Sequence, residues 1–130
     1  MSIRIVRLGS ARERGEGLRL GTVRHPPRGV PKREHAARDF YDVWLPELAP
    51  SADAVKLARS DASERAWERF VKRYRREMAA PERQRLLELL AALSQHASFS
   101  VGCYCEDESR CHRSILRELL KEHGGKVAGA

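Results

Sequence analysis

No apolar run in this sequence of 130 residues approaches the roughly 20 residues that a membrane-spanning helix needs. The N-terminus also lacks the uninterrupted apolar core of a signal peptide, because Arg4 and Arg7 interrupt residues 1–8. Cysteine is scarce: all three residues fall within nine positions, an odd and clustered set unlike a disulfide framework. We therefore expect a cytoplasmic protein with reduced thiols and no membrane partner.

Aromatic residues make up only 6% of the chain, and none lies between Arg12 and Arg38. That segment holds eight Lys or Arg and three Glu, so it contributes +5 to the net charge of +7. A basic excess attracts phosphates and other anions, whereas single-stranded nucleic acid usually needs aromatic stacking platforms. We expect an anionic small molecule or phosphate-bearing ligand as partner, with nucleic acid as a less supported alternative. A solvated basic face without any partner would have the same composition.

Apolar residues alternate along residues 2–8 and 18–23, and a short apolar run covers 98–103. These patterns predict three strands. Three prolines in residues 24–31 exclude helix and central strand there, because proline fixes φ and lacks an N–H donor. This arginine-rich segment is therefore expected to be a loop. Residues 41–48 form an irregular apolar patch.

Helical periodicity predicts four helices further along the chain. Ser51 is the expected N-cap of the first, and a capping box with Asp61 in the cap position opens the second. Pro81 suits the first position of the third helix, which is rich in leucine. The last helix begins at about residues 110–111 and stops at Gly124, since glycine readily ends a helix.

The predicted order is strand, strand, helix, helix, helix, strand, helix, which favours an α/β fold with a small sheet covered by helices. A chain of 14.8 kDa suits a single domain. We expect residues 1–124 to form that domain and residues 125–130 to be a frayed tail.

The segment Cys103-Tyr-Cys-Glu-Asp-Glu-Ser-Arg-Cys-His-Arg113 gathers three cysteines, a histidine and two arginines. It lies between a predicted strand and a predicted helix. Proteins of the α/β class place ligand-handling groups at such turns, because the helix N-terminus offers unpaired N–H groups and a positive dipole end. Metal binding, thiol chemistry and anion binding are each compatible with this composition.

As a metal site, Cys103, Cys105, Cys111 and His112 would make a complete ligand set for zinc. Their spacing differs from the usual knuckles, in which two residues separate paired ligands, and no second pair occurs elsewhere in the chain. Zinc is therefore kept as an alternative, and we assign no metal and no other cofactor.

As a thiol enzyme, the segment has a loop length like that of the rhodanese active site, with four residues between Cys105 and Arg110. Three carboxylates follow Cys105 directly and should raise its pKa, whereas Cys111 stands at the helix start beside His112 and Arg113. In this hypothesis Cys105 or Cys111 is the catalytic thiol of a sulfur or acyl transfer, and His112 is the acid or base.

As an anion-binding site, the segment needs no thiol chemistry, and this is the hypothesis that we favour. The arginine-rich loop would form one wall of a basic pocket and the cysteine segment the other. Arginine side chains would clamp a phosphate or carboxylate bidentately. Alternatively, the cysteines are small apolar residues buried at a strand end. The expected ligand-binding residues are Arg24, Arg28, Lys32, Cys103, Arg110 and Arg113.

Four segments carry a family resemblance: Gly17-Leu-Arg19 through Pro27-Arg-Gly-Val30, Trp44 to Ser51, Trp67 to Glu77, and Cys103 to Arg113. Together they resemble the DUF488 family, specifically its short YeaO-like members, over roughly Arg4 to His123. The resemblance implies an α/β fold with a mostly parallel sheet and no established activity. YeaO-like members often read Asp-Arg-Leu-Trp where this chain has Val23-Arg24-His25-Pro26. Many relatives lack the cysteines, which argues against an obligatory thiol mechanism.

Overall fold

Four parallel strands in the order β1-β4-β2-β3 form the sheet of the computed structural model, which describes residues 1–129. They are β1 (Ile3–Arg7), β2 (Leu18–Gly21), β3 (Val43–Trp44) and β4 (Phe99–Cys103). The three predicted strands and the parallel α/β class are confirmed. Strand β3 lies within the patch predicted to be irregular, because two residues are too few to show an alternating pattern.

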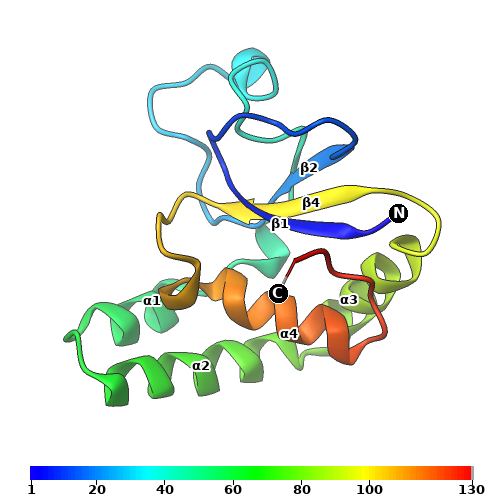
Figure 1. The fold of residues 1–130 in the computed structure, drawn as a ribbon. Coiled ribbons are helices and arrows are strands. Elements are labelled where there is room, and N and C mark those ends of the chain that lie inside the picture. Colours follow the sequence, from blue (N-terminus) through cyan, green and yellow to red (C-terminus); the bar gives the residue numbers. More distant parts are fainter. Residues whose placement is uncertain (130) are drawn as a thin grey trace.

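All four α-helices lie on one side of this sheet (Figure 1). None of them, within the part of the chain that the structure describes, combines the length and apolarity needed to cross a membrane. The helices are α1 (Ala52–Arg59), α2 (Glu64–Met78), α3 (Pro81–Leu93) and α4 (His112–Glu122). Three short 3-10 turns accompany them: η1 (Lys32–Glu34), η2 (Pro46–Leu48) and η3 (Glu108–Arg110).

The helix starts follow the capping signals, with one correction. The Ser51 hydroxyl accepts the N–H of Ala54, and Pro81 opens α3, as predicted. Helix α2, however, is capped by Ser63, whose hydroxyl accepts the N–H of Ala66 at 3.1 Å. Asp61 instead accepts the N–H of Ser63, so it stabilises the turn before the helix.

The hydrophobic core fills the space between the sheet and the helices. Strand residues Ile3 and Val101 have no exposed surface, and neither do Leu87 and Leu116 from the helices. Burial of each such side chain stabilises the fold by about 1.5–3 kcal/mol. Leu89, on the opposite side of α3, is 60% exposed. The leucines of this helix are therefore not confined to the face that packs against the core.

The C-terminal segment pairs with the edge strand β1. The N–H of Ile3 donates to the Lys126 carbonyl at 2.7 Å, and the N–H of Ala128 donates to the Ile3 carbonyl at 2.8 Å. Gly124, with a φ of +88°, lets the chain turn back after α4. The expected frayed tail is therefore wrong as far as Ala128, and Ala130 lies outside the described residues.

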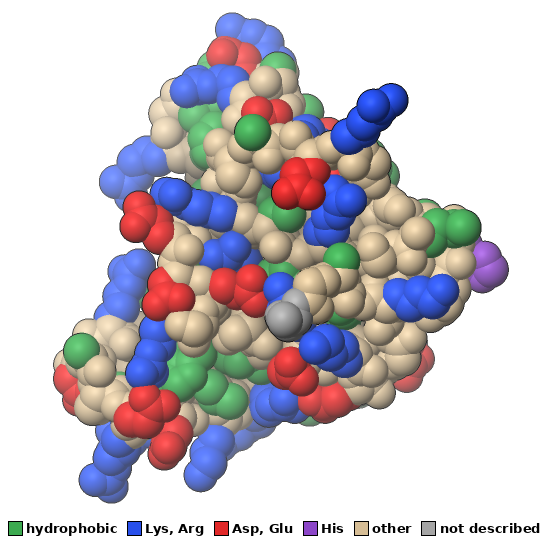
Figure 2. Space-filling view, viewed as in Figure 1, with side chains coloured by type: hydrophobic (Ala, Val, Ile, Leu, Met, Phe, Trp, Pro, Cys, Tyr) green, Lys and Arg blue, Asp and Glu red, His purple; other side chains and the backbone are tan. Residues whose placement is uncertain are grey.

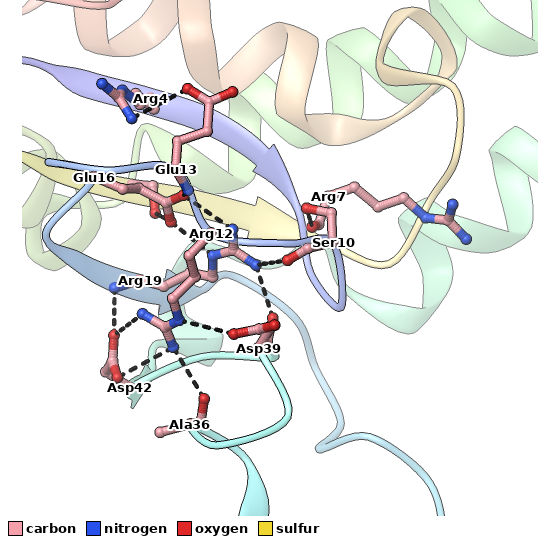
Figure 3. Close-up of polar contacts among 11 residues, drawn as sticks. Arg4, Arg7, Ser10, Arg12, Glu13, Glu16, Arg19, Ala36, Asp39 and Asp42 are labelled. Atoms are coloured by element: carbon pink, nitrogen blue, oxygen red, sulfur yellow. Dashed lines mark hydrogen bonds and ion pairs between the residues drawn. The ribbon is translucent and has the colours of Figure 1, made fainter.

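A buried ion pair closes the face of the sheet opposite to the helices. The guanidinium of Arg19, on β2, has no exposed surface and donates to Glu16 at 2.7 and 3.0 Å. It also donates to the carbonyls of Ser10 and Asp39, as Figure 3 shows. Ser100 on β4 donates to the same carboxylate at 2.8 Å. These bonds fasten two loops across the strands.

Candidate functional site

The turn between β4 and α4 lies at the carboxyl end of β4 (Figure 1). It carries three thiols, an imidazole and a guanidinium. Cys103 is the last residue of β4, and Cys111 is the N-cap residue of α4. His112 and Arg113 are the first two residues of that helix. The thiols of Cys103 and Cys111 are buried, whereas Cys105 is exposed, and all three are free. One thiol is thus accessible to a ligand.

His112 is held as a neutral imidazole in one tautomer. Its Nε2 lies 2.8 Å from the Thr22 carbonyl oxygen, which can only accept, so Nε2 carries the proton. Burial lowers the pKa of His112 to about 4. The unprotonated Nδ1 therefore remains free, and it faces the Cys111 sulfur at 3.7 Å.

The buried thiols and the imidazole lie close enough together to share a metal ion. The donor atoms of Cys103, Cys111 and His112 all lie within 4.8 Å of one another. A tetrahedral zinc ion binds sulfur at about 2.3 Å and nitrogen at about 2.0 Å, so its sulfur and nitrogen ligand atoms lie about 3.6 Å from each other. The Nε2–H of His112 donates to a carbonyl, a common second partner of metal-binding histidines. This donor set fits zinc.

The exposed thiol is the acidic member of the cluster. Hydrogen bonds from Cys103 and Cys111 lower the pKa of Cys105, and the charge of Arg113 lowers it further against the effect of burial. The pKa of Cys103 is raised, first by its bond to Cys105. For Cys111, a bond from Cys103 lowers the pKa, but the bond to Cys105 and burial raise it more. A single thiolate is therefore most stable on Cys105.

The three carboxylates that follow this thiol do not raise its pKa, so that expectation was wrong. Each of them bonds to a partner away from the sulfur. Glu106 pairs with Arg7 at 3.5 Å, Asp107 caps its own turn, and Glu108 pairs with Arg117 at 2.9 Å. The choice between the two candidate thiols is reversed as well, because Cys111 is buried and its pKa is raised.

Arg113 is a buried cation next to these thiols. Its side chain is 3% exposed, and its Nη2 donates to the Cys105 carbonyl at 2.6 Å. Its Nε has no hydrogen-bond partner within residues 1–129, and no carboxylate there forms an ion pair with it. Burial lowers the pKa of Arg113, but Cys103 and Cys111 raise it more. A buried guanidinium needs a negative partner, and the Cys103 and Cys111 thiols raise its pKa more than the Glu108 carboxylate does.

The arginine-rich loop begins beside this cluster and then leads away from it. The Tyr104 hydroxyl donates to the His25 carbonyl at 3.0 Å, which joins the loop to the cysteine segment. Arg24 lines a different pocket, which includes none of the thiols. Arg28 and Lys32 are exposed, and no hydrogen bond or ion pair within the described chain links them to residues 103–113.

Arg110 also points elsewhere than predicted. Its Nη2 lies 2.6 Å from a carboxylate oxygen of Glu64, and its guanidinium stacks 5.5 Å from the centre of the Trp67 ring. It therefore fastens the turn to α2.

Acidic side chains are interspersed among the Lys and Arg on the face in Figure 2, so the positive charge of that face is not gathered into one patch.

Thr22 was not predicted to be part of the site. Thr22 follows β2 and meets His112 because neighbouring parallel strands end at the same edge of the sheet. That edge was the signal that could have found it. A cysteine followed six positions later by an arginine is the spacing of a phosphate-binding loop, and Arg117 lies six positions after Cys111. Here, however, the intervening residues belong to helix α4, which directs Arg117 toward Glu108. These residues therefore form no phosphate-binding loop.

A family model described as "Active DUF488-N3 subclade" matches residues 3–124 of the chain. The match includes every strand and helix described above. Neither the curated proteins nor the solved structures contain a match.

Proposed function

The chain belongs to the DUF488 family, and we propose that it is a thiol-dependent enzyme of the cytoplasm with Cys105 as nucleophile. The observation that supports this most directly is Arg113, a buried cation that lowers the pKa of Cys105 and forms no ion pair with a carboxylate in residues 1–129. The matched family model is itself described as active. The four segments quoted above further suggest the YeaO-like branch.

The proposed reaction is a group transfer through a covalent intermediate. The Cys105 thiolate attacks an electrophilic sulfur or carbonyl carbon, and the leaving group departs with the bonding electron pair. A second nucleophile then takes the transferred group and releases the thiolate. Cys103 and Cys111 stabilise the thiolate as hydrogen-bond donors. His112 is a positioning residue, whose free Nδ1 faces the Cys111 sulfur at 3.7 Å.

An anionic substrate fits this centre. Arg113 and the first turn of α4 place positive charge next to the nucleophile. The arginine-rich loop starts beside the cysteine segment, so Arg24, Arg28 and Lys32 would raise the local concentration of anions near its entrance. We propose that these residues attract the substrate and that Arg113 stabilises the charge at the reacting sulfur.

Alkylation with iodoacetamide, followed by mass spectrometry of each cysteine peptide, tests the nucleophile. We expect rapid labelling of Cys105 at pH 6, where an ordinary thiol with a pKa of about 8.5 is almost entirely protonated. Arg113→Met should slow that labelling at least tenfold. Arg110→Met is the matched control, because Arg110 pairs with Glu64 and should leave the rate unchanged. Labelling of Cys105 at the rate of a free thiol at pH 6 would reject the proposal.

Zinc binding is the second candidate, favoured by the distances among Cys103, Cys111 and His112. Protein purified without chelator should then contain about one zinc per chain, with Cys105 as the fourth ligand. Elemental analysis of the protein, and of Cys111→Ser as a control, measures this directly. A metal content near zero, together with no uptake by reduced protein, removes this candidate.

A further inference from the structure

A second pocket, of about 610 Å³, opens between the end of β2, turn η2 and the junction of α2 with α3. None of the thiols lines it, and neither does His112 or Arg113. Its volume lies within the usual range of about 300–1,000 Å³ for small-molecule sites. It is therefore a separate candidate for ligand binding.

Positive charge dominates the lining. Three arginines, Arg24, Arg76 and Arg83, line the pocket. Arg24 and Arg76 are exposed, and neither guanidinium forms a hydrogen bond or ion pair within residues 1–129. Arg83 is positioned by its Nε–H, which donates to the Glu47 carbonyl at 2.9 Å. Two guanidinium groups are thus free for a ligand, and a third is already oriented.

The single carboxylate of the lining is already neutralised. Glu77 accepts the N–H of Ser51 at 2.9 Å and also the Ser51 hydroxyl. Its other contact is an ion pair with the Nε of Arg73 at 3.0 Å. Because Arg73 lies outside the lining, Glu77 leaves the charges of Arg24 and Arg76 uncompensated, whereas Arg83 also pairs with Glu82 at 3.6 Å.

The surrounding backbone also favours an anion. Helices α1 and α3 both begin at this pocket, behind Ser51 and Ala80, so the positive ends of both helix dipoles lie there. Helix α2 ends here, but its last carbonyls are occupied. They accept from the N–H groups of Ala79 and Ala80 and from the side chain of Gln84. Little negative potential therefore opposes an incoming anion.

We propose that this pocket binds a phosphate-bearing small molecule, independently of the thiol centre. Arginine presents a planar fork of donors that matches phosphate oxygens, and three such groups suit a doubly charged anion. The pocket is larger than a phosphate ion, and Pro46, Ala49 and Ala79 supply apolar surface for the rest of the ligand.

Titration with pyrophosphate by isothermal calorimetry tests this proposal. We expect saturable binding by the unmodified protein, weakened about tenfold by Arg24→Ala and by Arg76→Ala. Arg85→Ala is the matched control, because Arg85 belongs to α3 but does not line the pocket. Equal weakening by Arg85→Ala, or no binding at millimolar pyrophosphate, would overturn the proposal.

Two further measurements distinguish this pocket from the thiol centre and from a nucleic-acid surface. Cys105→Ser should bind pyrophosphate as the unmodified protein does, so a failure of the thiol mechanism leaves this site standing. A short DNA duplex should compete poorly, because a concave pocket admits a small ligand but not a helix backbone. Competition by duplex DNA at the same phosphate concentration would reject the small-molecule assignment.

Discussion

The Nε2 atom of His112 donates to the main-chain oxygen of Thr22 at 2.8 Å, although 90 positions separate the two residues in the chain. This bond joins the end of β2 to the first turn of α4. It also decides the chemistry of the imidazole, since the proton on Nε2 leaves Nδ1 as an acceptor facing Cys111. The sheet edge thus orients the thiol cluster through its backbone.

Two substitutions of His112 should separate its structural bond from its chemistry. Glutamine keeps an N–H near the position of Nε2, whereas asparagine reaches only the position of Nδ1. We expect His112→Asn to lower the free energy of unfolding by about 1–3 kcal/mol, because the buried Thr22 carbonyl loses its donor. His112→Gln should retain most of that stability. Urea denaturation measures both, and equal losses would contradict the assigned tautomer.

The two buried thiols should control the acidity of the third. Replacing both Cys103 and Cys111 by alanine removes the donors that lower the pKa of Cys105. We expect the pH midpoint of Cys105 alkylation to rise toward about 8.5 in this double variant. The rate at pH 6 should fall accordingly, while the rate at pH 10 stays similar. An unchanged midpoint would mean that Arg113 alone stabilises the thiolate.

Glu16 should make the fold sensitive to acid. Burial raises the pKa of its carboxyl, but hydrogen bonds from Arg19 and Ser100 lower it more, to about 2. The unfolded chain therefore binds the proton first as pH falls. Stability from this group is complete above about pH 4.5 and is lost as pH falls toward 2.

Glu16→Gln should remove that part of the pH dependence and also destabilise the protein at pH 7 by about 3–5 kcal/mol, because Arg19 stays buried without its partner. Glu13→Gln is the control, since Glu13 is 77% exposed and pairs with Arg4 at the surface. Chemical denaturation at several pH values compares the variants. Parallel curves for the unmodified protein and Glu16→Gln would refute this account.

Gly17 and Gly15 offer a matched pair for backbone sterics. Their φ angles are +80° and +81°, so alanine is strained at both positions. At Gly17 a Cβ would also lie 1.9 Å from the Ser98 carbonyl oxygen, whereas at Gly15 it meets no atom within 4 Å. We expect Gly15→Ala to cost about 1–2 kcal/mol and Gly17→Ala clearly more. Similar denaturation midpoints for the two variants would disprove the close approach.

Local pattern was enough to predict most of the fold. Ser51 and Pro81 mark helix starts through groups within a few residues, so their roles are visible in the sequence. Asp61 and Ser63 are both good cap residues, and only the backbone decides which of them caps α2. Leu89 fits a leucine-rich helix, yet which face packs depends on where the sheet lies.

The site was predictable as a location but less so as chemistry. Its cysteines, histidine and Arg113 are close in sequence, so one turn brings them together. The acidity of Cys105 was misjudged because the carboxylates that follow it bond to other partners, whereas Cys103, Cys111 and Arg113 lower its pKa. Glu106, for example, turns to Arg7, 99 positions earlier, and no spacing rule shows this. Likewise, no spacing rule shows that Arg24 lines a pocket that includes none of the thiols.

Strand β1 lies at the rim of the sheet, and the short C-terminal segment pairs with it there. A shortened protein that stops at Gly125 would present bare amide groups along that rim to neighbouring molecules, which is how open sheets begin to aggregate. An affinity tag for purification is therefore better fused to the N-terminus, where it does not disturb the pairing of the C-terminal segment with β1.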